Sequence, residues 1–136
     1  MDTERTRQLI HRFLEARGAN DYAGVYEVLA DDAEWFLPHS SPIGPFRGRE
    51  NVARALVEGA ASNSLDVSTI RRQVHKVLVD GDSAAVQLTL TAQTVNGNAY
   101  ENEYCWMYTC RDDRIQRVDE YVDMLRAART LGWISD

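Results

Sequence analysis

The first sixty residues show helical spacing interrupted by irregular segments. Apolar side chains recur every three to four residues up to Gly18, which predicts a helix with one buried face. Its apolar positions are Leu9, Ile10, Phe13 and Leu14. Asp21 can cap a second helix, and a third helix is predicted from Arg49 to Gly59. Between the second and third helices, residues 34–37 predict a short strand, and residues 38–48, which hold all three prolines, predict an irregular loop.

Apolar and polar residues then alternate with period two through most of the remaining chain, which is typical of strands. The predicted strands are Val67–Val79, Ala84–Val95, Ala99–Cys110 and Ile115–Met124. Turn sequences separate them, most clearly Asn96-Gly97-Asn98, and a short helix is predicted over residues 125–131. Helices followed by hairpin-linked strands predict an α+β fold, with helices packed on one antiparallel sheet. No shift in composition divides the 136 residues, so we expect a single domain spanning 1–136.

Composition narrows the classes of function. The chain has 21 acidic and 15 basic residues and a net charge of −6, whereas nucleic-acid-binding proteins usually present a basic face, so we expect no nucleic-acid partner. No run of 18 apolar residues could cross a membrane, and no apolar signal-peptide run follows Met1, so we expect a cytoplasmic protein without membrane contact. No Cys/His cluster has zinc spacing and no Gly-rich phosphate loop occurs, so we expect neither a metal nor a cofactor.

Four phrases of the sequence together indicate a family. They are Phe13–Ala16 with Asn20-Asp21, Leu29–Ala33 leading to Trp35, Phe46–Val52, and Asp113–Ile115 followed by Asp119–Asp123. In this order the chain resembles the nuclear transport factor 2-like superfamily, above all its SnoaL-like and ketosteroid-isomerase-like members. The resemblance implies a cone-shaped α+β barrel, in which three N-terminal helices pack on a strongly curved antiparallel sheet and leave a pocket at the open end. It also implies a homodimer, and a fold that serves isomerases, cyclases, hydrolases and non-catalytic modules.

The catalytic residues of two relatives do not carry over fully. The proton-abstracting Asp of ketosteroid isomerase corresponds to Leu37, and its oxyanion-hole acid falls near Cys105 or Trp106. None of these three side chains carries a carboxyl group, so the resemblance does not imply steroid isomerase chemistry.

Limonene epoxide hydrolase gives a second comparison by pattern. The Tyr and Asn that help to hold its nucleophilic water correspond to Trp35 and Leu37, and its Arg and one Asp correspond to Thr89 and Thr91. Only its second Asp finds a carboxylate counterpart, which is Glu120. The resemblance therefore implies a scaffold with one carboxylate.

Glu120 is the main catalytic candidate. Period two places Val118, Glu120 and Val122 on one face of the last strand, so Glu120 faces the pocket if the valines do. Partial burial would raise the pKa of this carboxyl towards neutrality and suit it to general acid–base catalysis. The alternative is a structural ion pair with a core arginine, for which Arg17 is the candidate. A register slip of one residue would exchange Glu120 with Asp119 or Tyr121.

Other side chains could serve the same pocket. His39, in the Pro-rich loop near the expected mouth, is a second catalytic candidate, although a lone loop histidine is more often solvated. The candidate substrate-binding residues are Arg17, Tyr22, Trp35, Thr89, Thr91, Asn102, Tyr104, Trp106 and Val122. Aromatic residues of this set could line a ligand pocket or simply pack in the core.

The sequence leaves three hypotheses open. The first is a cofactor-independent acid–base enzyme, an isomerase, cyclase or hydrolase, acting on a hydrophobic small molecule. The second is a non-catalytic module that binds such a molecule. The third is an assembly module whose outer sheet face contacts a second copy through Glu103, Cys105, Met107 and Thr109.

Overall fold

The computed structural model of the chain describes residues 1–59 and 61–135. Three helices lie in the N-terminal part, namely α1 (Thr3–Gly18), α2 (Tyr22–Val28) and α3 (Arg49–Glu58). The Asp2 and Asp21 side chains accept backbone N–H bonds at the starts of α1 and α2, which satisfies donors that a helix leaves free. The predicted helices and the Asp21 cap are therefore confirmed.

A single six-stranded sheet forms the rest of the core. Its strands are β1 (Leu29–Phe36), β2 (Phe46–Arg47), β3 (Leu65–Asp80), β4 (Ser83–Thr94), β5 (Ala99–Arg111) and β6 (Arg114–Val122), in the order β2-β1-β6-β5-β4-β3. Successive strands from β3 to β6 are antiparallel hairpins. Gly97 takes a φ of 85° in the β4–β5 turn, a conformation that glycine adopts without steric cost.

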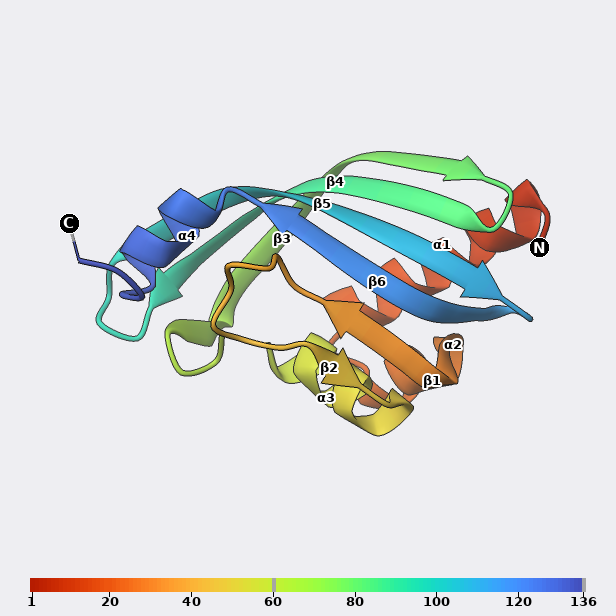
Figure 1. Cartoon of the computed structure of the whole chain (residues 1–136), viewed down its shortest axis with the longest axis horizontal. Helices are drawn as coiled ribbons and strands as arrows, with labels where there is room; N and C mark the ends of the chain where they lie inside the picture. Colours follow the sequence, from red (N-terminus) through yellow and green to blue (C-terminus); the bar gives the residue numbers. More distant parts are fainter. Residues whose placement is uncertain (60, 136) are drawn as a thin grey trace.

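The sheet curves over the helices without closing on itself (Figure 1). Leu9, Ile10 and Phe13 of α1 are fully buried against its inner face, and the Phe13 ring meets Tyr108 of β5 edge-on at 5.5 Å. The last helix, α4 (Met124–Thr130), lies at the end of the sheet away from the N-terminus. This arrangement confirms the predicted α+β cone.

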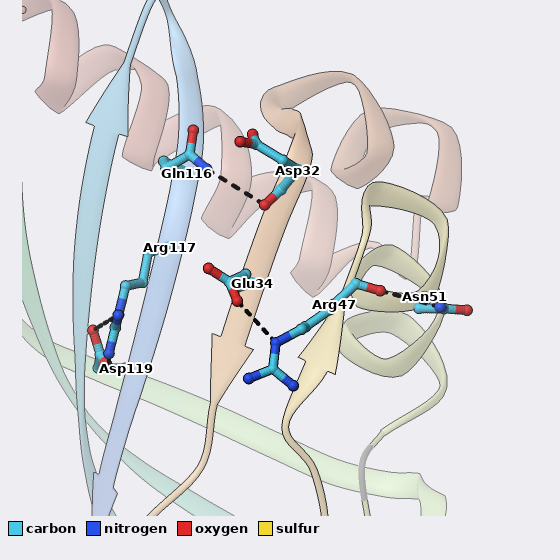
Figure 2. Close-up of polar contacts among 7 residues, drawn as sticks. All are labelled: Asp32, Glu34, Arg47, Asn51, Gln116, Arg117 and Asp119. Carbon is cyan, nitrogen blue, oxygen red and sulfur yellow. Dashed lines mark hydrogen bonds and ion pairs between the residues drawn. The ribbon is translucent and has the colours of Figure 1, made fainter.

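Two details of the first strands depart from the sequence prediction. β1 begins at Leu29, five residues before the predicted strand, and pairs with β6 in parallel, so the sheet is mixed. β2 lies inside the predicted irregular loop and pairs with β1 (Figure 2). An Arg47–Glu34 ion pair of 3.0 Å joins the two strands there. β1 and β6 are far apart along the chain, and β1 and β2 are separated by a loop, so local alternation reports neither pairing. In the described residues, no helix is long and apolar enough to span a lipid bilayer.

Candidate functional site

A cavity of about 70 Å³ lies between the inner face of the sheet, the end of α1 and the C-terminal segment. Strand residues on its wall are Trp35, Leu65, Val67, Ile70, Arg72, Leu90, Tyr104, Trp106, Glu120 and Val122. The remaining wall residues are Arg17, Leu37, Ser41, Ile43, Gly59, Ala61, Ser62, Met124, Ala127, Leu131 and Trp133. Most of these side chains are apolar, and the ionisable groups among them are two arginines, one glutamate and one tyrosine.

Glu120 faces this cavity from β6, as the alternation predicts. It lies opposite Trp106 on β5 and is 8% exposed. Burial raises the pKa of its carboxyl to about 7. The positive charges of Arg17 and Arg72 and the indole of Trp106 oppose this shift without cancelling it. Glu120 can therefore hold or release a proton near neutral pH.

Its neighbour Asp119 lies on the other face of the sheet. Two of its oxygens accept from the Arg117 guanidinium at 2.9 to 3.1 Å (Figure 2). The register of β6 thus places Glu120, and not Asp119 or Tyr121, at the cavity.

Arg17 lies at the C-terminal end of α1 and is 5% exposed. Its Nε donates to the Leu56 carbonyl at 3.2 Å, and its guanidinium lies 3.8 Å from the centre of the Trp106 ring. Burial, and then the like charge of Arg72, lower the pKa of Arg17, although a guanidinium keeps its proton at neutral pH. Arg17 forms no ion pair of 4.0 Å or less with Glu120. The alternative of a closed Arg17–Glu120 pair is therefore not what this structure shows.

Arg72 of β3 is a site residue that the sequence analysis missed. It lies opposite Leu90 and shares the inner face with it. Its Nε is buried and has no hydrogen-bond partner among the described residues. Burial lowers the pKa of Arg72, and Tyr104, Tyr108 and Glu120 oppose that shift.

A bulge hides Arg72 from period-two counting. The register between β3 and β4 shifts between Val74 and Lys76. Counting back from Val77, which lies opposite the buried Val86, places His75 and Arg71 on the inner face. In the structure the bulge reverses this, so Arg71 is exposed and Arg72 turns inward.

Aromatic side chains complete the wall beside Glu120. The ring centres of Trp35 and Trp106 lie 5.5 Å apart. The hydroxyl oxygens of Tyr104 and Tyr100 lie 2.8 Å apart and share a hydrogen bond. Burial raises the pKa of Tyr104 above its usual value, so this hydroxyl keeps its proton. The structure thus gathers these predicted residues around one cavity: Arg17, Trp35, Tyr104, Trp106, Glu120 and Val122.

Thr89 and Thr91 were predicted to contact substrate, and their placement on the opposite face of the sheet corrects that prediction. Thr89 hydrogen-bonds Glu103 at 2.8 Å and His75 at 2.6 Å, and Thr91 is exposed. Leu88 and Leu90 occupy the inner face instead, because strand side chains alternate.

Three other predicted residues also lie away from the cavity. Tyr22 is 40% exposed in the first turn of α2, where it stacks on Tyr26. His39 is exposed, and Ser41 and Ile43 of the same loop line the cavity in its place. Asn102 is buried on the inner face, but its amide donates to Tyr100 Oη at 2.9 Å and to the Asp123 carbonyl at 3.0 Å. Asn102 therefore positions α4 and does not line the cavity.

The arrangement has the groups that proton transfer on a largely apolar molecule requires. Glu120 can take or give a proton, two guanidinium groups can stabilise negative charge, and the wall around them is mostly apolar. In residues 1–59 and 61–135, no three His, Cys, Asp or Glu side chains gather to hold a metal ion.

Solved structures of known proteins share the fold over nearly the whole chain. An NTF2-like protein from Burkholderia xenovorans is 25% identical, with 96% of this chain and 98% of that chain covered and a TM-score of 0.79. An LEH-like epoxide hydrolase from M. tuberculosis is 19% identical, covering 96% and 92%, with a TM-score of 0.73.

A third structure, TerC co-crystallised with polyporic acid, is 15% identical, covers 94% of this chain and 98% of that chain, and has a TM-score of 0.80. No curated protein matches the chain. The family model described as the SnoaL-like domain matches residues 10–118. Together with the curved sheet over three helices, this match shows that the chain belongs to the SnoaL-like domain family.

Proposed function

We propose that this protein is a cofactor-independent acid–base enzyme that acts on a small hydrophobic molecule in the cavity, with Glu120 as the proton-transferring group. The observation that carries the proposal is a carboxyl group of pKa about 7 on the wall of a largely apolar cavity. A base of that pKa is matched to neutral pH, where its ionised and protonated forms are both available.

The step common to isomerisation and cyclisation is removal of a proton beside a carbonyl. Glu120 would take the proton, the C–H electron pair would move toward the carbonyl, and the carbonyl oxygen would gain the negative charge. Tyr104, Trp106, Trp35 and Val122 would hold the apolar part of the molecule. The similar epoxide hydrolase and the TerC complex with polyporic acid support a small organic ligand, and hydrolysis remains a third reaction type.

A proton-abstraction probe tests the proposal before the natural substrate is known. Nitrobenzisoxazole opens in one step when a base removes its ring proton, and it releases a coloured phenolate. Glu120→Gln should lower the rate at least about 100-fold, the lower end of general-base contributions. Because the base must be ionised, the wild-type rate should rise with pH through about 7.

Asp119→Asn is the matched control, since this neighbouring carboxylate lies on the outer face with Arg117. It should leave the rate unchanged. If wild type and Glu120→Gln are both folded and react at equal rates, Glu120 is not the catalytic base.

A non-catalytic binding module is the second candidate. It is favoured by Leu37, which lines the cavity at the position where ketosteroid isomerase carries its base. In that case the wild-type chain would bind apolar ligands in the cavity without accelerating proton transfer, and Glu120→Gln would change affinity alone.

A further inference from the structure

The cavity wall carries more positive than negative charge. Its cationic side chains are Arg17 and Arg72, and its carboxyl group is Glu120. Neither guanidinium forms an ion pair with Glu120. Burial lowers the pKa of both arginines, and the charge of Arg72 lowers the pKa of Arg17 further. A buried and a half-buried positive charge with incomplete compensation are unfavourable together, so an anion beside them would be stabilised.

The same wall has an excess of hydrogen-bond donors. Buried nitrogens of two lining residues have no acceptor among the described residues, namely Arg72 Nε and Trp35 Nε1. Guanidinium and indole N–H groups can only donate. A ligand that supplies oxygen acceptors would therefore satisfy groups that the fold leaves without partners.

A second cavity of about 380 Å³ lies against the first. The two share four wall residues, Arg17, Val67, Ile70 and Arg72. Arg72 thus stands where the small cavity beside Glu120 meets a larger space.

We infer that the cavity binds small molecules with an apolar body and a delocalised oxyanion, such as a carboxylate or an enolate, and that Arg72 together with Arg17 holds the oxyanion. The inference rests on the proposed function for its location, because it names the substrate class of the Glu120 cavity. Arg72 is then a binding residue in its own right. It would also stabilise the charge that appears on a carbonyl oxygen when Glu120 takes a proton.

Benzoate and its neutral isostere benzamide provide the test. Binding is measured by calorimetry for the wild-type chain and for Arg72→Met and Arg72→Lys. Benzoate should bind more tightly than benzamide, and Arg72→Met should weaken benzoate at least about tenfold while leaving benzamide unchanged. Arg72→Lys keeps the charge without the planar fork, so its loss should be smaller. This second variant keeps the test valid if Arg72→Met fails to fold.

Arg71→Met is the matched control. Arg71 is adjacent and exposed, and its Nη1 donates to the Ser68 and Ile70 carbonyls. It also lines the second cavity and not the first. An equal loss in Arg71→Met would place benzoate outside the Glu120 cavity and overturn the inference. If inorganic phosphate binds as tightly as benzoate, the ligand does not need an apolar body, and that part of the inference is wrong. If benzamide binds as tightly as benzoate, the ligand does not need a negative charge, and the oxyanion site is wrong.

Glu120→Gln separates this inference from the proposed function. The charged or titratable groups around Glu120 are Arg17 of α1, Arg72 of β3, and Tyr100, Tyr104 and Tyr108 of β5. Of these groups, Glu120 alone changes charge near neutral pH, since burial raises the pKa of each tyrosine. Wild-type affinity for benzoate should therefore fall as pH rises through about 7.

Glu120→Gln should bind benzoate without that pH dependence. If this variant also keeps full proton-transfer activity, the proposed function fails while the oxyanion site stands. If benzoate does not bind to any variant while Glu120→Gln abolishes the nitrobenzisoxazole reaction, the oxyanion inference fails while the proposed function stands.

Discussion

Glu120 owes its properties to a balance between burial and nearby charge. Two guanidinium groups favour its ionised form, yet burial outweighs them and raises the pKa of the carboxyl to about 7. Arg17 donates to Leu56 and stacks on Trp106, which keeps it from closing onto the carboxylate. The arginines therefore tune Glu120 without neutralising it, and the carboxyl stays available to a ligand.

This balance predicts a pH dependence of stability. The folded carboxyl has a pKa of about 7 against an ordinary value of 4.5, so the native state binds more protons than the unfolded state between these values. The free energy of unfolding should then fall as pH rises, by about 1.4 kcal/mol per unit and roughly 3 kcal/mol in all. Urea denaturation across this range should show that decline in the wild type and its loss in Glu120→Gln.

Asp119→Asn serves again as the control. Its free energy of unfolding should fall with pH as steeply as that of the wild type, because the surface ion pair of Asp119 with Arg117 contributes little to stability. A Glu120→Gln variant whose stability still declines in parallel with the wild type would show that another group titrates in this range.

The elements differ in how far local sequence determines them. The β3–β6 hairpins follow from alternation and turn sequences such as Asn96-Gly97-Asn98, and both are short-range signals. The parallel pairing of β1 depends on β6, far along the chain, and the short strand β2 pairs with β1 across an irregular loop, so alternation missed both. In the site, alternation found Glu120 and Trp106, while the β3 bulge concealed Arg72. The same alternation places Thr89 and Thr91 on the outer face, which contradicts the substrate-binding role that the pattern of a relative suggests for them.

Helix α4 closes one side of the cavity through Met124 and Ala127, and its start depends on a cap. Asp123 accepts from the Arg126 backbone N–H at 3.1 Å. Asp123→Ala should cost about 1 kcal/mol of stability. Amide hydrogen exchange should become faster in α4, because the cap orders its first turn.

Asp21→Ala removes an equivalent cap from α2, where the Asp21 side chain accepts from Gly24 N at 3.0 Å, and α2 does not line this cavity. Its stability loss should be similar, but exchange in α4 should rise only as far as the global loss requires. Identical exchange profiles for the two variants would contradict a local role of Asp123 in closing the cavity.

In the part of the chain that the structure describes, helices cover one face of the sheet. Helices α1, α2 and α3 lie against the inner face, and the outer face of β3 to β6 is left without a layer (Figure 1). Leu78, Met107 and Tyr121 stand on this outer face with 59%, 38% and 59% of their surfaces exposed. We call these three residues the outer apolar patch. A patch of this kind is where the homodimer expected from the family resemblance would form.

Met107→Glu tests that expectation, because it places a charge in the outer apolar patch between Leu78 of β3 and Asp119 of β6. If a second copy covers the patch, burying the new carboxylate without a partner should raise the dissociation constant of the dimer at least about tenfold. Sedimentation velocity over a range of concentrations measures this shift. Val95→Glu makes the same change at an exposed valine of the β4–β5 turn and should leave the dimer intact. A wild-type chain that stays monomeric, or equal behaviour of both variants, would show that the outer face is not the dimer interface.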